Sequence, residues 1–513
     1  MIFPKRRYAM AGELQPVLRT GPTISVRRAL AFSFAQKYVL ASIHIVSTII
    51  VARLLSPSEI GVFMVGNAVV SMTEVFRDFG VSTYLIQARE ITLARVRTAF
   101  TVTLLLSALL STLLLILSGG IADFYEEAGV QQVLYLAAIN FLMVPFAATI
   151  MTLLRRDMAF DRLVRINLAA TISYCGSLIG LAALGFGYMS LAWAALISSA
   201  IGTLTAILHR PDLRIFIPGF SEWRQVVSFG SVSSATALLN GLYSSLPQLF
   251  LGRMLDFGAV GLYSRATMLC QLFDRFVLDG VNPVVLPALA ARVRDGNELK
   301  TPYLRALEYI TALYWPFLLC MVLLADPVVK LLLGSQWDGA VPLVRIIALA
   351  SLSMFPAFLT YPVLVALGRV RDTLTMSLIT LPPSLALLFG ASFLSLEAVA
   401  ASLLIAAPFQ VYVALIFIRR QIHFSWGEIA RATQKSALAA LCAAAVPAIV
   451  LASAGFRFEI SIPAAILTGI GAVIAWIAGL AIAKHPLWNE VREVPRSTLL
   501  RITLRLPKNR AKS

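Results

Sequence analysis

Residues 98–118 read TAFTVTLLLSALLSTLLLILS, a run of 21 residues without a charged side chain. A helix of about 20 apolar residues crosses the hydrocarbon core of a bilayer, which is about 30 Å thick. The run therefore predicts a transmembrane helix. Similar runs recur along almost the whole chain of 513 residues, which is 59% hydrophobic and only 13% charged. Soluble proteins carry about 25% charged residues, so this composition indicates a polytopic membrane protein.

The apolar runs predict an all-α fold with about fourteen transmembrane helices. Some neighbouring runs merge, so the number of helices lies between about 12 and 14. The expected spans are residues 29–52, 59–85, 98–118, 130–152, 166–185, 189–208, 229–252, 258–288, 307–325, 340–367, 373–394, 396–418, 436–455 and 461–483.

Basic residues alternate from loop to loop along the chain. Of the 43 Lys and Arg residues, 34 lie in the two tails and in every second loop, and only four lie in the other loops. Cytoplasmic loops carry the excess of Lys and Arg in membrane proteins. We therefore expect an even number of helices with both tails in the cytoplasm, and we expect the acidic loop 119–129 on the outer side.

Charge, cysteines and motifs exclude several classes of protein. The net charge of +17 lies mainly in tails and loops beside the membrane, which favours contact with anionic lipid over a nucleic-acid site. The four cysteines lie in separate spans, so we expect neither a disulfide framework nor a metal site. The sequence has no P-loop, HExxH or GxSxG motif and no large outer loop. We therefore expect no enzyme, no cofactor and no nucleic-acid partner.

The chain also contains a repeat at an offset of 200 residues. Residues 51–63 read VARLLSPSEIGVF and residues 251–263 read LGRMLDFGAVGLY, so that Gly61 aligns with Gly261. Chance similarity between apolar segments is the alternative, but polar residues and glycines match at one fixed offset. Parallel repeats of this kind are typical of transporters that bind substrate between two lobes.

The repeat predicts how the chain is divided. The expected units are a cytoplasmic tail at 1–28, a lobe of helices 1–6 at 29–208, a cytoplasmic linker at 209–228, a lobe of helices 7–12 at 229–418, helices 13 and 14 at 419–483, and a basic cytoplasmic tail at 484–513.

Four cationic or titratable residues inside the spans predict a binding site. A charge in lipid is costly and usually faces a cavity or another charge. At 1.5 Å per helical residue, His44 in the first span and Arg265 in the eighth lie at similar depths of about 12 Å, and Lys37 lies at about 22 Å. Together with Arg275, they predict a cationic cleft between the lobes that attracts a phosphate or pyrophosphate. For His44, a role in a proton-coupled cycle and a simple helix-to-helix hydrogen bond are equal alternatives.

The second span carries charges that favour a structural role. Glu74 lies at the depth of Lys37, so these two side chains are expected to form an ion pair. Arg77 and Asp78 follow three and four residues after Glu74, which places them on a neighbouring face near the inner surface. The Arg77 side chain is expected either to couple to these carboxylates or to snorkel toward water.

The eighth span carries Asp274, Arg275 and Asp279 below Arg265. Asp279 follows Arg265 by fourteen residues, which is four turns of a helix and nearly the same face. The alternative to a role in binding or coupling is a pair between Arg275 and Asp279 that only fixes helix packing.

Several segments together resemble a known family. They are ARLLSPSEIGVFMVGNAVV (52–70), FRDFGV (76–81), LLRRDMAFDRLVRI (153–166), DFGAVGLYSRATML (256–269) and LLLGSQWDGAVPLVRIIALA (331–350). In this order and spacing, the chain resembles the polysaccharide and oligosaccharide flippases of the multidrug/oligosaccharidyl-lipid/polysaccharide exporter superfamily, over roughly residues 25–455.

The resemblance implies two six-helix bundles with helices 13 and 14 outside them, in the inner membrane of a bacterium. It implies that the protein flips undecaprenyl-pyrophosphate-linked oligosaccharide repeat units by alternating access, during exopolysaccharide or lipopolysaccharide biosynthesis. The implied partners are this lipid-linked oligosaccharide, membrane lipids, and polysaccharide polymerase and export machinery. Related lipid II flippases hold pyrophosphate with arginines on the first, second and eighth helices. Here Lys37 and Arg265 match the first and eighth, whereas Arg77 lies too near the inner surface.

Two other classes of function are alternatives to a flippase. A cation-coupled multidrug antiporter of the same superfamily is the main alternative, and it requires a buried carboxylate in the first or seventh helix. Neither predicted span contains Asp or Glu. A membrane enzyme such as a polymerase requires a large loop that carries catalytic groups, and the sequence has none.

Overall fold

The computed structural model describes residues 26–78, 81, 85, 91–221, 223, 241–453, 455, 460–490 and 492; for 26–37, 75, 78 and 279–283 it describes the backbone alone. All regular secondary structure in these residues is helical, which confirms the all-α prediction. Ten of the described helices are long and apolar enough to cross a membrane, with Ala340–Ala366 taken as one span. The number of fourteen spans stays a prediction.

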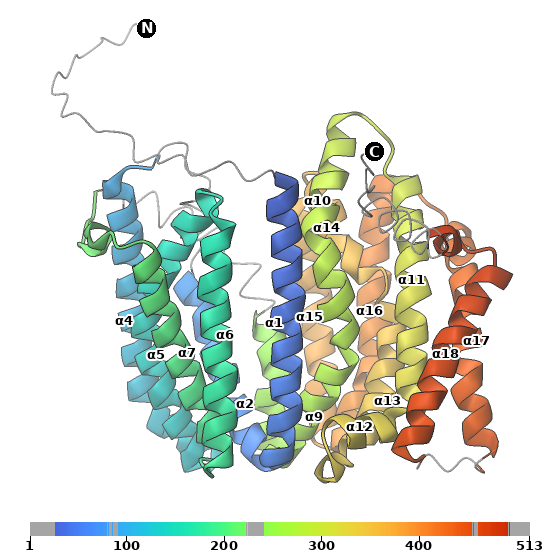
Figure 1. The fold of residues 1–513 in the computed structure, drawn as a ribbon, viewed down its shortest axis with the longest axis horizontal. Coiled ribbons are helices and arrows are strands. Elements are labelled where there is room, and N and C mark those ends of the chain that lie inside the picture. Colours follow the sequence, from blue (N-terminus) through green and yellow to red (C-terminus); the bar gives the residue numbers. More distant parts are fainter. Residues whose placement is uncertain are drawn as a thin grey trace, which may run out of the picture.

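A first bundle forms from the amino-terminal helices (Figure 1). Its members are α1 (Val26–Leu54), α2 (Pro57–Asp78), α4 (Leu93–Tyr125), α5 (Ala128–Arg156), α6 (Phe160–Ala183) and α7 (Met189–His209), followed by the short η1 (Leu213–Phe216). The helix α5 packs against α4 and α7, and α6 packs against α7 and α1.

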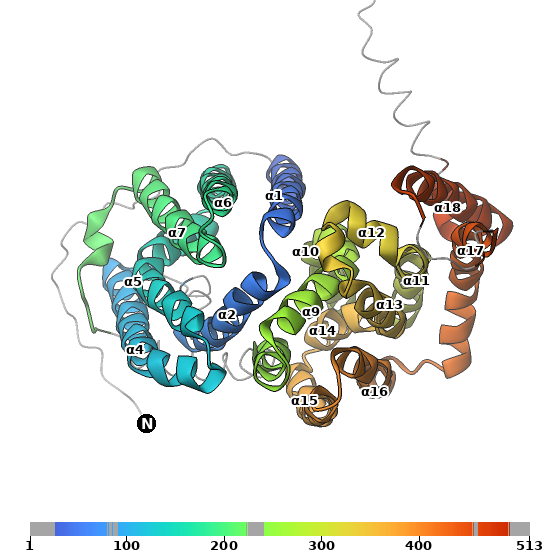
Figure 2. The ribbon, with the colours of Figure 1, turned by 90° about the horizontal axis from the view of Figure 1, so that it is seen from below.

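A second bundle lies beside the first, as the view along the helices shows (Figure 2). Its members are helical residues 241–254, α9 (Phe257–Cys270), η2 (Asp274–Leu278), α10 (Asp279–Arg294), α11 (Lys300–Leu323), α12 (Ala325–Leu332), η3 (Ser335–Trp337), α13 (Ala340–Ser351), η4 (Leu352–Met354), α14 (Ala357–Ala366), α15 (Val370–Ser392) and α16 (Leu396–Ile422). The helix α13 packs against α9, α11 and α16, so it occupies the centre of this bundle.

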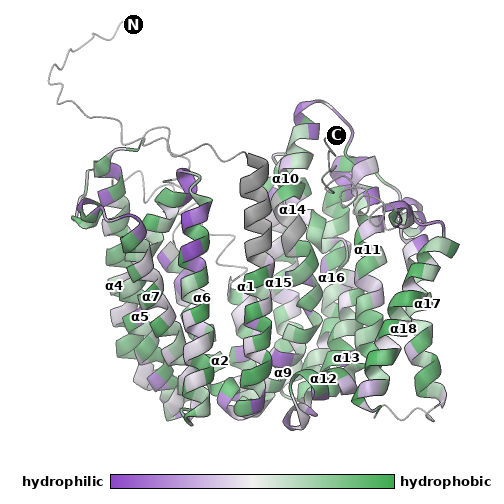
Figure 3. Ribbon diagram, in the orientation of Figure 1, coloured by the Kyte–Doolittle hydropathy of each residue, from purple (hydrophilic) through white to green (hydrophobic). Residues whose placement is uncertain are grey.

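The last two described helices, α17 (Trp426–Ser453) and α18 (Ile462–Ile482), form a pair outside the second bundle. The helix α17 packs along α11 and α18 packs along α17. The flanks of the helices expose large apolar side chains such as Ile116 and Leu467, which is the pattern expected of a lipid-facing surface. Hydrophobic residues cover the middle of the molecule and hydrophilic ones gather toward its ends (Figure 3).

The two bundles meet closely where α2 crosses α9. Both helices begin with a side chain that accepts a hydrogen bond from the third residue on: Ser56 from Glu59 N–H, and Asp256 from Ala259 N–H. At the crossing, Gly61 lies on the backbone carbonyl of Phe257. Gly261 lies on the carbonyl of Pro57 in the same way. The contacts are therefore duplicated at the 200-residue offset found in the sequence.

A second set of contacts joins the bundles at the same end. We call it the latch; it consists of Ala52, Arg53, Leu55, Leu331, Gln336 and Trp337. The N–H of Ser56 donates to the Glu59 carboxylate, so it does not serve the carbonyl of Ala52 four residues earlier. A helix end leaves such carbonyls without an intrahelical donor. Here the second bundle supplies the donors.

Each bundle caps a helix end of the other in the latch. The indole N–H of Trp337 donates to Ala52 O at 2.6 Å, and the Gln336 amide donates to Ala52 O and Leu55 O. In return, the Arg53 guanidinium donates to Leu331 O at 2.6 Å, near the carboxyl end of α12. The end of the molecule that carries the α1–α2 turn is therefore closed by reciprocal hydrogen bonds.

The structure corrects several predicted boundaries near this end. The expected loop 119–129 is mostly helical, because α4 continues to Tyr125 and Glu127 accepts a hydrogen bond at the start of α5. The exposed Glu126 carboxylate pairs with Arg253 of the second bundle at 3.2 Å. The helix α12 was not predicted. Its eight residues are too few for a span, and its apolar face packs beside α11 and α13.

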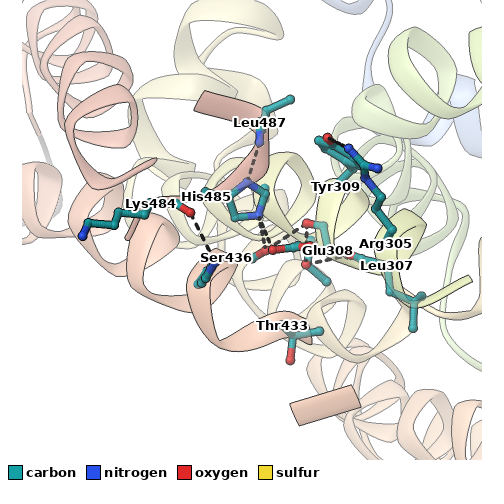
Figure 4. A network of polar contacts seen from close by, with 12 residues as sticks. Arg305, Leu307, Glu308, Tyr309, Thr433, Ser436, Lys484, His485 and Leu487 are labelled. Atoms are coloured by element: carbon teal, nitrogen blue, oxygen red, sulfur yellow. Dashed lines mark hydrogen bonds and ion pairs between the residues drawn. The ribbon is translucent and has the colours of Figure 1, made fainter. Parts of the chain in front are cut away.

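A buried histidine attaches the end of α18 to the second bundle (Figure 4). His485 is 1% exposed, and its Nδ1 accepts the backbone N–H of Leu487. Its Nε2 lies 3.1 Å from Ser436 Oγ and 3.9 Å from Glu308 Oε1, while the Ser436 hydroxyl donates to Glu308 O. These contacts fit a neutral imidazole that carries its proton on Nε2.

Candidate functional site

The central residue of the site is Arg265, which lies midway along α9. Its side chain is only 7% exposed. The guanidinium lies 6.0 Å from the ring centroid of Trp337, and Nη1 lies 3.6 Å from the sulfur of Met268. Its Nε has no hydrogen-bond partner, and within the described part of the chain no carboxylate forms an ion pair with it. A buried cation with this environment retains its capacity to bind an anion.

Three further residues form a group with Arg265: His44 and Tyr174 lie on helices of the first bundle, and Arg275 lies just beyond the end of α9. His44 of α1 lies against Tyr174 of α6, with ring centroids 5.5 Å apart. The element η2, which carries Arg275, contacts α1, which carries His44. The structure therefore brings together three of the four residues predicted for the cationic site. Tyr174 joins these three residues. We call the resulting group, His44, Tyr174, Arg265 and Arg275, the cation cluster.

Sequence reasoning missed Tyr174. A single tyrosine in an apolar span carries no distinctive signal, although its place in the middle of α6 matches the depth of the other members. Its phenol ring closes one side of the cluster and belongs to the first bundle, whereas Arg265 and Arg275 belong to the second. The cluster therefore lies at the boundary between the bundles.

Lys37 lies on α1, and its side chain falls outside the described residues, so its place in the site stays a prediction. The expected pairing of Lys37 with Glu74 is untested for the same reason. Glu74 instead pairs with Arg77 at 3.2 Å, as the spacing of three residues allows.

Of the two alternatives for Arg77, the structure shows the ion pair with Glu74 and not a side chain that snorkels to water. Arg77 is 8% exposed and lies over the ring of Phe141 on α5, 5.0 Å from its centroid. Its guanidinium is thus buried inside the first bundle. The side chain of Asp78 is outside the described residues.

The predicted eighth span is not a continuous α-helix. The segment Asp274–Leu278 is a π-helix between α9 and α10. A π-turn takes in an extra residue, so positions beyond it rotate relative to those before it. Counting four regular turns from Arg265 to Asp279 therefore fails, and the two residues do not share a face. The side chain of Asp279 itself is outside the description, and that of Asp274 is half-buried.

The π-helix brings Arg275 close to α1 of the first bundle. It begins directly beneath α9 and carries Arg275, which is exposed at this point. Irregular helix at membrane depth is tolerated where it is buried in protein or lines a water-filled space. The break in the helix thus places a second guanidinium beside α1, near His44.

Comparison with known families identifies the chain. Residues 50–342, more than half of its length, match the family of polysaccharide biosynthesis proteins. The chain belongs to this family. The matched region includes Tyr174, Arg265 and Arg275, whereas His44 precedes it.

Two similar proteins carry names from polysaccharide biosynthesis. The lipopolysaccharide biosynthesis protein WzxC of Escherichia coli K12 is 20% identical over 61% of the present chain, and the match spans 64% of that relative's length. The succinoglycan biosynthesis transport protein ExoT of Rhizobium meliloti 1021 is 26% identical over 68% of the chain and 71% of its own length.

The fold is also that of a solved transporter. The lipid II flippase MurJ in its inward closed conformation matches 88% of this chain and 98% of its own, with a TM-score of 0.73 and 11% sequence identity. At that identity, the match establishes a shared arrangement of helices and not a shared substrate.

Proposed function

We propose that this family member is a flippase that moves a lipid-linked oligosaccharide across the bacterial inner membrane. The observation that carries the proposal is Arg265, a buried guanidinium at the boundary of two bundles, without a paired carboxylate among the described residues. A phosphate group supplies the negative charge and the oxygen acceptors that such a guanidinium requires.

The proposed substrate is an undecaprenyl-pyrophosphate-linked repeat unit. The pyrophosphate binds the cation cluster together with Lys37, while the prenyl chain stays in the lipid beside the bundles. Names of two relatives support this class, because one is a lipopolysaccharide biosynthesis protein and the other a succinoglycan transport protein. The shared fold with a lipid II flippase supports it as well.

The orientation follows from the charge pattern. Arg155, Arg156, Arg294 and Arg369 lie at helix ends remote from the α1–α2 turn, and we place these ends in the cytoplasm. The closed end with the latch then faces outward. The headgroup enters from the cytoplasm, binds at the cation cluster, and leaves outward when the latch and the α2–α9 crossing separate. Both termini are cytoplasmic in this arrangement.

The proposed flippase moves its substrate without changing it chemically and passes it to other proteins. The flippase breaks no covalent bond, so it acts as a transporter and hands the repeat unit to a polymerase and export machinery outside. The antiporter alternative receives no support from the site, since no carboxylate forms an ion pair with Arg265 among the described residues.

The test is made in the native bacterium with a chromosomal deletion complemented by variants. We expect the deletion and Arg265→Ala to abolish surface polymer and to accumulate polyprenyl-linked repeat units that face the cytoplasm. Arg165→Ala is the matched control, because this arginine is exposed in an ion pair with Asp161 of the same helix and should leave export intact. Wild-type export by a folded Arg265→Ala protein would contradict the proposal, and periplasmic unpolymerised units would indicate a polymerase.

A further inference from the structure

Trp337 contacts both the cation cluster and the latch. It lies in η3 and is fully buried. The face of its indole ring supports the Arg265 guanidinium, 6.0 Å from the ring centroid. The edge of the same ring donates its N–H to Ala52 O at 2.6 Å. One rigid side chain therefore touches the proposed anion site on its face and the first bundle on its edge.

The two contacts of Trp337 act on each other through the ring. A cation over an indole face is attracted by the π-electrons, and it makes the N–H at the ring edge a better donor. An anion bound to Arg265 neutralises this cation and draws the guanidinium toward itself. Both effects weaken the bond from the indole to Ala52 O.

We propose that Trp337 is a positioning residue that couples anion binding at Arg265 to opening of the latch. The inference rests on the proposed function, because it takes Arg265 as the anion site. Opening leaves Ala52 O and Leu55 O without their donors from the second bundle. These carbonyls lie at the end of α1, where water replaces the lost donors once the bundles separate. Occupied protein thus opens outward, and empty protein stays closed.

Coupling of this kind is reciprocal. If the anion weakens the latch, then a variant whose latch is already broken must bind the anion more tightly. Trp337→Phe keeps an aromatic face under Arg265 and removes the N–H. We expect it to bind inorganic pyrophosphate about fivefold more tightly than the wild type, or more. A merely structural role for Trp337 leaves this affinity unchanged or lowers it.

The experiment uses the full chain in lipid nanodiscs. Isothermal titration with inorganic pyrophosphate gives the Kd, and hydrogen–deuterium exchange of peptides over residues 47–60 reports whether the latch is open. Trp476→Phe is the matched control: its indole N–H also donates to a backbone carbonyl, Ala312 O at 2.8 Å, but far from the latch. We expect pyrophosphate to raise exchange in the wild type and in Trp476→Phe. Trp337→Phe should exchange fast without pyrophosphate.

The possible results distinguish a failure of the Trp337 coupling from a failure of the anion site at Arg265. Tighter pyrophosphate binding by Trp337→Phe, with the control unchanged, supports the coupling. If the wild type binds pyrophosphate and Arg265→Ala does not, but Trp337→Phe has the wild-type Kd, the coupling is wrong and the anion site stands. If binding does not depend on Arg265, the proposed site fails and the coupling fails with it. Should Trp337→Phe not fold, Gln336→Met breaks the neighbouring latch bond, and an unchanged Kd in that variant refutes the coupling.

Discussion

Gly61 lies so close to the backbone carbonyl of Phe257 that an added Cβ atom would be 1.7 Å from the carbonyl oxygen. The equivalent distance from Gly261 to the carbonyl of Pro57 is 2.0 Å. Both obstacles are backbone atoms at the starts of helices, so no side-chain rotation relieves the overlap. Glycine at these two positions is what allows the bundles to close.

Gly61→Ala and Gly261→Ala should therefore hold the bundles apart at this end. The measurement is labelling of a cysteine introduced at Val65, which is fully buried and would contact any Cβ added to Gly252 of the second bundle. We expect an impermeant maleimide to label Val65→Cys several-fold faster in either alanine variant. Gly120→Ala is the control, because nothing lies within 4 Å of the Cβ it adds. Equal labelling in all three variants would contradict this account of the closure.

Arg265 should determine the affinity for pyrophosphate. A hydrogen bond to a charged group contributes about 1.5–3 kcal/mol, which corresponds to about a 10- to 100-fold change in Kd. We expect Arg265→Ala to lose affinity by about this factor and Arg265→Lys to lose less, because lysine keeps the charge but not the planar fork. Titration of purified protein with pyrophosphate checks this. Identical affinities in the alanine variant and the wild type would remove Arg265 from the site.

His485 should make the attachment of α18 sensitive to acid. Burial lowers the pKa of His485 below its usual value of about 6.5; a hydrogen bond with the Glu308 backbone opposes this effect, and the charge of Lys435 adds a smaller lowering. The neutral form is bonded in the folded protein, so its stabilisation is complete above about pH 6.5. It is lost as the pH falls from there toward the folded-state pKa. The Tm in detergent should fall over this range in the wild type.

His485→Gln should flatten that fall, since glutamine takes up no proton. His209→Gln, which changes a half-exposed histidine at the end of α7, should leave the fall as it is in the wild type. A pH profile of His485→Gln that matches the wild type would show that other groups cause the acid sensitivity.

Arg77 and Glu74 should contribute unequally to stability, although they form one ion pair. The Arg77 side chain is buried over Phe141, while Glu74 is 43% exposed. We expect Arg77→Ala to lower the free energy of unfolding by about 1–3 kcal/mol, through lost packing and a lost cation–π contact. Glu74→Gln should cost less than about 1 kcal/mol, as exposed ion pairs do. Thermal unfolding of the two purified variants compares them directly.

Much of this architecture could be predicted from apolar runs, because the hydrocarbon core imposes a length on every span. The similar depths of His44 and Arg265 could also be predicted by counting residues along helices. The count failed where the helix changes its geometry, at Asp274–Leu278, since no residue type marks a π-turn. The latch was equally hidden: Trp337 and Ala52 are far apart in sequence, and a hydrogen bond to a backbone carbonyl leaves no pattern of residue types.

The duplicated crossing of α2 and α9 resembles the interface of a homodimer. In an isologous pair, residue 61 of each subunit would touch residue 57 of its mate, and here Gly61 touches Phe257 while Gly261 touches Pro57. Such an interface needs one self-complementary patch, because the symmetry axis supplies the second copy. In a single chain that contains both copies, each patch need only fit the other, so the two can differ in sequence. Arg53 and Arg253, which align in the repeat, already differ in this way: one donates to a backbone carbonyl, the other pairs with Glu126.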